Sequence, residues 1–270
     1  MGKYLVCLLF IFNISFLKSQ TILKANGTED TYQLINKHLS VNANVVETPD
    51  CTHKDFGNHI TQEWDKELKE YVFVFHAHLN TDNDRCKKFD RQRTEIKTYK
   101  KSPRDLIATQ GDKFQYSWLF KLDSTFSPSK RFTHLHQIKA IGGPEDKMPS
   151  ITFTARRKGN HTEVLQILYA EKLDQEKLLS IDLEKIKGKW IQVEETITFE
   201  EKGKASYDLT IIDHATNSII IEYKNDNLRM WKTNAEVMRP KWGIYRSILS
   251  PDNMKDEKVK FNNFSIHKLN

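Results

Sequence analysis

The chain has 270 residues, of which 38% are hydrophobic and 11% aromatic, enough for the packed core of one sizeable domain. Its mean hydropathy of −0.63 and its 29% of charged residues indicate a soluble, surface-rich protein and exclude a polytopic membrane protein. The formal net charge of +6 points to an anionic partner, although a basic surface that only aids solubility would give the same composition.

The first twenty residues have the layout of a secretory signal peptide. Lys3 gives a positive start, an apolar run follows over residues 4–17, and the segment ends in Ser19 and Gln20. The apolar run is too short for a comfortable membrane span, and an N-terminal anchor is the alternative. We therefore expect a signal peptide over 1–20, a single domain over 21–270, and a secreted or periplasmic protein without membrane contact after signal removal.

Export from the cytoplasm limits which partners the mature chain can meet and exposes its cysteines to oxidising conditions. Loss of Lys3 and Lys18 lowers the formal charge from +6 to +4. Export argues against nucleic acid and leaves an anionic polysaccharide as the natural partner of a basic monomer. Cys51 and Cys86 remain, either as one disulfide or as two free thiols. There is no CxxC pair and no His/Cys cluster with zinc spacing, so no metal ligands are predicted.

Along the chain, one helical pattern precedes a long series of β-strand patterns. A modest helical pattern covers 31–40, and a second covers 174–189, where the latter half could instead be a loop that leads to Trp190. Strand patterns cover 71–80, 93–99, 114–123, 131–140, 150–157, 163–170, 189–199, 207–213, 218–224, 242–249 and 258–269. Clusters of Gly, Asn, Asp and Pro separate them, so we expect an all-β jelly roll, a concanavalin-like sandwich of two sheets with a concave substrate groove.

Three of these strands carry an unusual polar face. The solvent-facing side of an outer strand is usually a mixture of Lys, Glu, Thr and Ser. Alternation places Lys241, Gly243, Tyr245 and Ser247 on one face, and Leu135, Gln137 and Lys139 on another. His134 and His136 then fall on the opposite side, toward the core. The most charged face belongs to RQRTEIKTY and consists of Arg91, Arg93, Glu95, Lys97 and Tyr99. A solvated outer strand is the alternative interpretation of that stretch.

The three motifs RTEIK (93–97), QIK (137–139) and KWGIY (241–245) resemble, in order and rough spacing, the strand motifs of jelly-roll polysaccharide lyases of the alginate-lyase type. Glucuronan lyases, ulvan lyases and heparinase-type lyases are similar on the same scaffold, and the resemblance spans about residues 55–270. The alginate pattern has His where this chain has Lys139, Gln where it has Ser247, and Arg where it has Lys97. A lysine in that slot is more similar to jelly-roll ulvan lyases, for which a Lys/Tyr pair is implied to transfer protons.

The resemblance implies cleavage of a uronate-containing polysaccharide, such as ulvan, glucuronan or an alginate-like chain, by β-elimination. That reaction removes a weakly acidic proton beside a carboxylate, so the enzyme must neutralise the carboxylate, for which we expect Arg93 and Gln137. Tyr245 is expected as general acid, and also as a candidate base, with Lys139 as second partner. Glu95 is expected to hold Arg93 or Lys139 in position. Further substrate contacts are expected from Arg91, Lys97, Tyr99, Trp231 and Lys241.

No catalytic metal or organic cofactor is implied, and a structural calcium ion stays open, for example near residues 83–85. His76 and His78 could either line the cleft or cap the sheet, and the sequence leaves both roles open.

Two other functions compete with the lyase. A non-catalytic carbohydrate-binding module would keep the basic groove and lose the proton-transfer pair, whereas a glycoside hydrolase would need two carboxylates about 5–5.5 Å apart.

Overall fold

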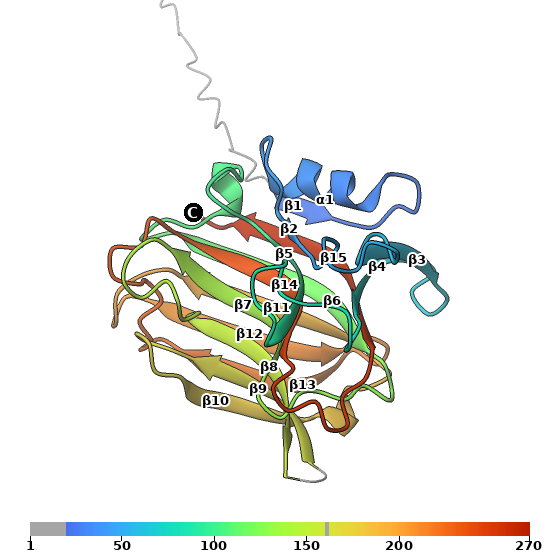
Figure 1. The fold of residues 1–270 in the computed structure, drawn as a ribbon. Coiled ribbons are helices and arrows are strands. Elements are labelled where there is room, and N and C mark those ends of the chain that lie inside the picture. The colour runs from blue at the N-terminus through green and yellow to red at the C-terminus, as the bar shows by residue number, and fades with distance from the viewer. Residues whose placement is uncertain (1–19, 160–161) are drawn as a thin grey trace, which may run out of the picture.

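The computed structural model describes residues 20–159 and 162–270 (Figure 1). Fifteen strands in this part of the chain form two antiparallel sheets that pack face to face as a β-sandwich. The expected signal peptide lies outside the described residues, except for Gln20. Among the residues described, no helix is long and apolar enough to cross a membrane.

The first sheet, sheet 1, has β6 and β15 at its centre. Its strands lie in the order β13 (Ser218–Asn225), β12 (Ser206–Asp213), β11 (Trp190–Thr198), β6 (Lys113–Leu122), β15 (Glu257–Lys268), β4 (Glu70–Ala77) and β3 (Ile60–Asp65), and β1 (Gln20–Leu23) also pairs with β15. The helix α1 (Thr31–Leu39) lies at one edge of the sandwich beside β1 and β2 (Figure 1). Asp30 caps its first turn by accepting a hydrogen bond from the Gln33 backbone.

The second sheet, sheet 2, carries the three motifs on neighbouring strands. Its order is β10 (Glu176–Asp182), β9 (Thr162–Tyr169), β8 (Ile151–Lys158), β7 (Thr133–Ile141), β14 (Val237–Ser247), β5 (Arg91–Lys97) and β2 (Val46–Glu47). Two short 3-10 helices, η1 (Arg104–Leu106) and η2 (Leu183–Lys185), lie in the connections.

The core fills the space between the sheets with the inward halves of the alternating strands. Tyr116, Trp118 and Phe120 of β6 are buried, as their alternation predicts. Across the core, the ring of Trp118 lies 5.9 Å from that of Trp242 on β14. Because most inward positions are apolar, the charged positions of β5 and β14 face out of sheet 2, except Arg246. Its buried guanidinium donates to Gln92 and to the backbone oxygens of Ala77 and Lys255.

All eleven predicted strands are present, and the helix predicted over 31–40 is confirmed as α1. The helix predicted over 174–189 is wrong. Its first half forms the edge strand β10, which pairs with β9. A register irregularity between Lys177 and Leu179 lets the adjacent leucines, Leu178 and Leu179, both pack against the core. Cross-strand pairing therefore overrides the local helical pattern. The second half is a turn with η2 that leads to Trp190, as the alternative expected.

Candidate active site

Strands β7, β14 and β5 place the motif residues in cross-strand rows on the outward face of sheet 2. Tyr245 of β14 pairs with Arg93 of β5 on one side and with His134 of β7 on the other. In a second row, Lys241 pairs with Lys97 and with Gln137. Directly paired residues of neighbouring strands have Cβ atoms within about 5.5 Å, so each row forms a local group of side chains.

These rows line a groove of about 600 Å³. The carboxylates among its described lining residues are Glu47 and Asp146. The basic residues that line it are Arg85, Lys88, Arg91, Arg93, Lys97, Lys139, Lys147, Arg239 and Lys241. Such an excess of positive charge attracts polyanions and concentrates them at the groove.

Most of the predicted site residues come together here. Arg91, Arg93, Lys97, Tyr99, Gln137, Lys139, Lys241 and Tyr245 line the groove. Glu95 is fully buried directly beneath it. Trp231 is not brought to the groove, because backbone hydrogen bonds from Met230 and Trp231 to Glu200 hold this turn so that the indole packs in the core.

Glu95 ties the three motif strands together. Its carboxylate contacts Arg93 on its own strand, accepts from the amide of Gln137 at 2.6 Å on β7, and pairs with Lys241 at 2.5 Å on β14. Burial by itself would raise the pKa of Glu95, but the Lys241 ammonium and the Arg93 guanidinium hold that pKa below its ordinary value. Glu95 therefore holds Arg93 in position, as expected, but holds Lys241 and Gln137 instead of Lys139.

Glu47, from the edge strand β2, is a second anchor that the sequence did not indicate. It pairs with Lys241 at 2.6 Å, Lys97 at 2.8 Å and Arg85 at 2.5 Å. Burial acts to raise the pKa of Glu47, yet Lys241, Lys97 and Arg93 keep that pKa far below its usual range. Lys97 and Lys241 thus have carboxylate partners within the protein, although burial lowers the pKa of both, that of Lys241 to about 8.

Arg93 keeps a donor available although it is held on both sides. Its Nε and Nη2 donate to Asp84 at 2.8 and 3.2 Å, and its Nη1 donates to Glu95. Burial alone would lower the pKa of Arg93, but Glu95, Asp84 and Glu47 raise it above the ordinary value, so the guanidinium stays charged. A guanidinium has five N–H groups. Because Nη1 also lies 3.6 Å from Glu47, the second N–H of Nη2 is the donor that remains for a ligand.

The Tyr245 phenol lies between guanidinium groups. Arg91 Nη1 donates to its Oη at 2.9 Å, and the Arg93 guanidinium lies 3.6 Å from the ring centroid. Its ring contacts those of Phe132 and His134, with centroids 5.2 and 5.7 Å away. Because Oη accepts from Arg91, its own O–H remains available to donate to a ligand in the groove.

His134 lines the groove, whereas strict alternation placed it toward the core. The pairing of β7 with β8 shifts register between His134 and His136, and that of β7 with β14 shifts between Trp242 and Tyr245. These irregularities turn Leu135 into the core and His134 outward, while His136 stays buried as expected. Burial lowers the pKa of His134 to about 3, so its imidazole is neutral at pH 7. Its Nδ1 is buried and has no hydrogen-bond partner among the described residues.

Lys139 lies at the other end of the groove, away from Tyr245. It pairs with Arg239, which precedes Tyr245 by six residues on β14, or roughly 20 Å along the strand. Its Nζ donates to the backbone oxygen of Lys147 at 3.1 Å. Burial, together with Arg239 and Lys241, lowers the pKa of Lys139 to about 8. The expected pairing of Lys139 with Tyr245 on one sugar unit is therefore not supported by the strand register.

Arg239 is a groove residue that the motifs did not include. It shares the outward face of Lys241, two residues before it, so a longer stretch of β14 alternation would have found it. Its Nε and Nη1 are buried without hydrogen-bond partners among the described residues, and its guanidinium lies 5.7 Å from the Tyr99 ring centroid. Burial lowers the pKa of Arg239 to about 10. An unpaired guanidinium beside Lys139 suits a second anionic group of the ligand.

Gly243 of the KWGIY motif permits the close approach of β14 and β5. Its φ is +145°, and a Cβ built there would lie 2.1 Å from the Thr94 backbone oxygen. We expect Gly243→Ala to cost about 3 kcal/mol of unfolding free energy, because it adds backbone strain and a clash with a fixed strand. Denaturant unfolding measures this loss.

Gly203→Ala is the matched control for this prediction. Gly203 also has a positive φ, of +84°, but a Cβ there meets nothing within 4 Å. The control should lose only about 1 kcal/mol. Equal losses in the two variants would show that the approach of the Thr94 backbone does not matter.

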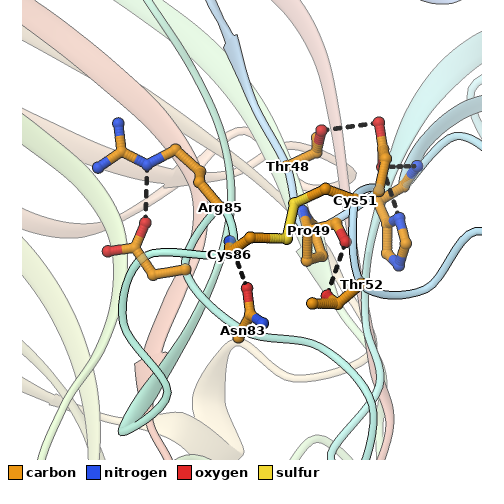
Figure 2. Close-up of a disulfide and its surroundings, with 10 residues drawn as sticks. Thr48, Pro49, Cys51, Thr52, Asn83, Arg85 and Cys86 are labelled. Carbon is orange, nitrogen blue, oxygen red and sulfur yellow. Dashed lines mark hydrogen bonds and ion pairs between the residues drawn. A yellow bond between two sulfur atoms is a disulfide. The ribbon is translucent and has the colours of Figure 1, made fainter.

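Cys51 and Cys86 form a disulfide, which decides between the two alternatives left by the sequence (Figure 2). The bond joins the loop after β2 to the loop before β5. Asn83 Oδ1 accepts from the backbone N–H of Cys86 at 2.7 Å, and Arg85 donates to Asp84 at 2.8 Å. The crosslink therefore lies beside the carboxylates that hold Arg93 and Lys241.

The hairpin over 141–149 forms one wall of the groove and is fastened at its tip. Glu145 pairs with Arg229 at 3.3 Å and accepts from the backbone and hydroxyl groups of Thr233 at 2.9 and 2.8 Å. A Cβ at Gly143, where φ is +80°, would lie 2.1 Å from the Thr233 backbone oxygen. These ties hold the hairpin as a fixed wall of the groove.

Comparisons with known proteins find the fold and no close relative. No protein-family model matches the chain, and no curated protein matches it. A marine PL-14 alginate lyase from Aplysia kurodai superimposes with a TM-score of 0.58 at 13% identity, over 91% of this chain and 97% of that one. An endo-β-1,4-glucuronan lyase from Trichoderma reesei gives 0.54 at 12% identity, over 78% and 88%.

A variant of the alginate lyase Aly36B, solved in complex with alginate trisaccharide, gives a TM-score of 0.51 at 11% identity, over 93% of this chain and 99% of that one. The matches cover between 88% and 99% of each of these three neighbours. At such identities the likeness concerns architecture alone. The chain therefore has the jelly-roll fold of the polysaccharide lyases that act on alginate and glucuronan, as its motifs predicted.

Proposed function

We propose that this protein is an exported polysaccharide lyase that cleaves a uronate-containing polysaccharide by β-elimination. The observation that carries the proposal is the row Arg93–Tyr245–His134, which crosses three strands at the floor of a groove lined mainly by cations. It combines a charged group, a proton donor and a neutral imidazole on three neighbouring strands, with the Tyr245 ring 3.6 Å from the Arg93 guanidinium and 5.7 Å from the His134 ring. The fold shared with alginate and glucuronan lyases supports the same class of substrate.

The row supplies what the elimination needs. A base removes the proton at C5 of the uronate, the electron pair forms the C4–C5 double bond, and the C4–O4 bond breaks as O4 receives a proton. The free donor of Arg93 suits the uronate carboxylate, whose charge otherwise opposes removal of the C5 proton. Gln137, in the neighbouring row, adds an amide donor. Its own position is fixed by Glu95 at 2.6 Å.

Tyr245 is assigned as the general acid that protonates O4, and His134 as the base that takes the C5 proton. The imidazole is neutral and lines the groove on the strand next to Tyr245. A uronate carboxylate bound nearby opposes the effect of burial and raises the basicity of the imidazole. His134 then supplies the histidine that the alginate-lyase pattern has where this chain has Lys139. Lys139 and Arg239 bind a carboxylate on another unit of the same polymer.

The charge state of the groove argues against hydrolysis. A glycoside hydrolase needs one carboxylic acid that is protonated and one carboxylate. Glu47, which lines the groove, is held ionised by three cations, and Glu95 is buried beneath the floor with ionised partners. Neither can donate a proton near neutral pH.

The test of the proposal is incubation with ulvan, glucuronan, alginate, heparin and pectate, with the ultraviolet absorbance of the new conjugated double bond as readout. A rise on one polymer establishes elimination and names the substrate, because hydrolysis creates no such bond. Binding to the same polymers is measured in parallel. Binding without any rise would refute the lyase and favour a carbohydrate-binding module.

Substitution separates His134 from Lys139. We expect His134→Gln to lower kcat by about 10²–10⁴-fold, the usual contribution of a general base. Lys139→Gln should raise KM and leave kcat within a few-fold, since it removes a contact at a distant sugar unit. Initial rates over a range of polymer concentrations give both constants. The reverse pattern, with kcat lost in Lys139→Gln, would restore Lys139 as the base and reject the present assignment.

A further inference from the structure

A cluster of imidazoles lies outside the groove, between the loop after β2 and the loop after β4. His53, His59, His78 and Asp82 each direct one ligand atom inward, and these four atoms all lie within 4.8 Å of one another. We propose that these four residues bind a divalent transition-metal ion of the zinc type, as a structural site. The inference does not depend on the proposed function.

The distances place the three rings around one carboxylate. Asp82 Oδ1 lies 3.0 Å from His53 Nδ1 and 3.0 Å from His59 Nε2, and Asp82 Oδ2 lies 3.1 Å from His78 Nδ1. In a tetrahedral zinc site with bonds near 2.0–2.1 Å, ligand atoms are about 3.3 Å apart. The contacts to Asp82 are therefore close to the separations that zinc ligands have, and no two of the four ligand atoms are more than 4.8 Å apart.

The surroundings of His59 point to a cation between the rings and Asp82. This imidazole is fully buried and faces a carboxylate with each nitrogen: Asp50 at 2.6 Å from Nδ1 and Asp82 at 3.0 Å from Nε2. A neutral imidazole carries one N–H, so one nitrogen would turn a lone pair toward a carboxylate. Either a second proton or a metal ion must relieve that contact.

Asp50 has the geometry of the outer carboxylate that orients a metal-binding histidine. It also accepts hydrogen bonds from the hydroxyl groups of Tyr32 at 2.9 Å and Thr48 at 2.8 Å, so its own position is fixed. A carboxylate bound to the far nitrogen of a ligating imidazole fixes its tautomer and raises its basicity. A second proton on His59 would explain the two carboxylate contacts of that ring alone. A metal ion would also explain why His53 and His78 converge on the same point.

The donor set selects the metal. Three imidazoles and one carboxylate suit zinc and its neighbours, whereas calcium and magnesium take oxygen ligands. Four protein ligands close the coordination sphere, which is typical of a structural site. The ring of Phe56 covers the cluster, with its centroid 4.2 Å from that of His78 and 4.9 Å from that of His59.

The site would fix the loop that supports the groove. Asp82 precedes Asp84, whose carboxylate holds Arg93, by two residues. The side-chain amide of Gln92 donates to the backbone oxygens of His78, Leu79 and Asp82, at 2.5, 3.0 and 3.2 Å, so this loop is also fastened to β5. With the Cys51–Cys86 disulfide, the metal would be a second crosslink between the same two loops.

The experiment uses the mature chain, without a histidine tag, after treatment with a chelator and dialysis against Zn²⁺. We expect one equivalent of zinc after gel filtration, none of calcium under the same conditions, and a rise in the unfolding temperature with added Zn²⁺. Replacement by Co²⁺ should give the visible absorption of a four-coordinate site without thiolate bands.

Variants locate the ion. His78→Ala and Asp82→Asn should each weaken zinc binding at least tenfold, whereas His214→Ala, at an exposed histidine of the β12–β13 turn, should bind like the wild type. His78 is partly exposed, so this variant leaves the core intact, and circular dichroism checks its fold. Less than a tenth of an equivalent in the wild type would overturn the proposal. So would equal binding by His78→Ala, or a His59 ring that stays doubly protonated by NMR when Zn²⁺ is added.

Discussion

Replacing Tyr245 by phenylalanine should abolish elimination while the groove still binds its polymer. The variant removes the hydroxyl that accepts from Arg91 and that we propose protonates O4. A general acid contributes about 10²–10⁴-fold to the rate, so we expect kcat to fall by about 10³-fold. The ring, and its contact with the Arg93 guanidinium, are kept. The affinity for the polymer should therefore change only a few-fold.

Two measurements check this result. The initial rate of double-bond formation gives kcat, and calorimetric titration with a polymer that the wild type cleaves gives the affinity of the inactive variant. Tyr71→Phe is the control, since Tyr71 lies partly exposed against Trp64 on β3, outside the groove-lining residues. It should keep wild-type activity. A Tyr245→Phe variant with more than a tenth of the wild-type kcat would remove Tyr245 from the proton transfers.

Replacing Glu95 by glutamine should give the largest loss of stability at the site. The carboxylate is fully buried and is shared by Arg93, Lys241 and Gln137 on three strands. Removing one partner of a buried ion pair leaves the remaining charges uncompensated, which typically costs about 3–5 kcal/mol. Denaturant unfolding at pH 7 measures this cost. Glu222→Gln, at an exposed position of β13, should change the free energy of unfolding by less than about 0.5 kcal/mol.

The same carboxylate predicts the pH dependence of stability. The folded pKa of Glu95 lies below its value in the unfolded chain, which is about 4.3 for a glutamate. Its contribution is therefore fully present above the unfolded pKa and is lost as the pH falls through the lower folded pKa. Burial lowers the pKa of Lys241, the partner of Glu95, to about 8, so the comparison is made at pH 6 and below. The difference in unfolding free energy between wild type and Glu95→Gln should be greatest near pH 6 and shrink on acidification. A difference that grows in acid would contradict the ionised state of Glu95.

The sequence determined the fold class and the outward faces of the site strands. The alternation of β5 and β14 is a local pattern with a period of two, so it placed Arg93, Lys241 and Tyr245 on the groove side without knowledge of any partner strand. The basic composition of those faces likewise predicted a site for an anionic ligand. These features depend only on residues that are close together along the chain, so they can be predicted from the sequence.

Tertiary structure alone decided which of these residues meet. A bulge shifted the parity of β7 and brought His134 beside Tyr245, whereas the register of β7 against β14 places Lys139 opposite Arg239. Glu47 joined the site from an edge strand of two residues, which is too short to show a period. The histidine cluster joins positions as far apart as His53 and Asp82, with no zinc spacing between them. Strand register, bulges and loop closure depend on packing between distant segments, and a one-residue slip in any of them changes which side chains face one another.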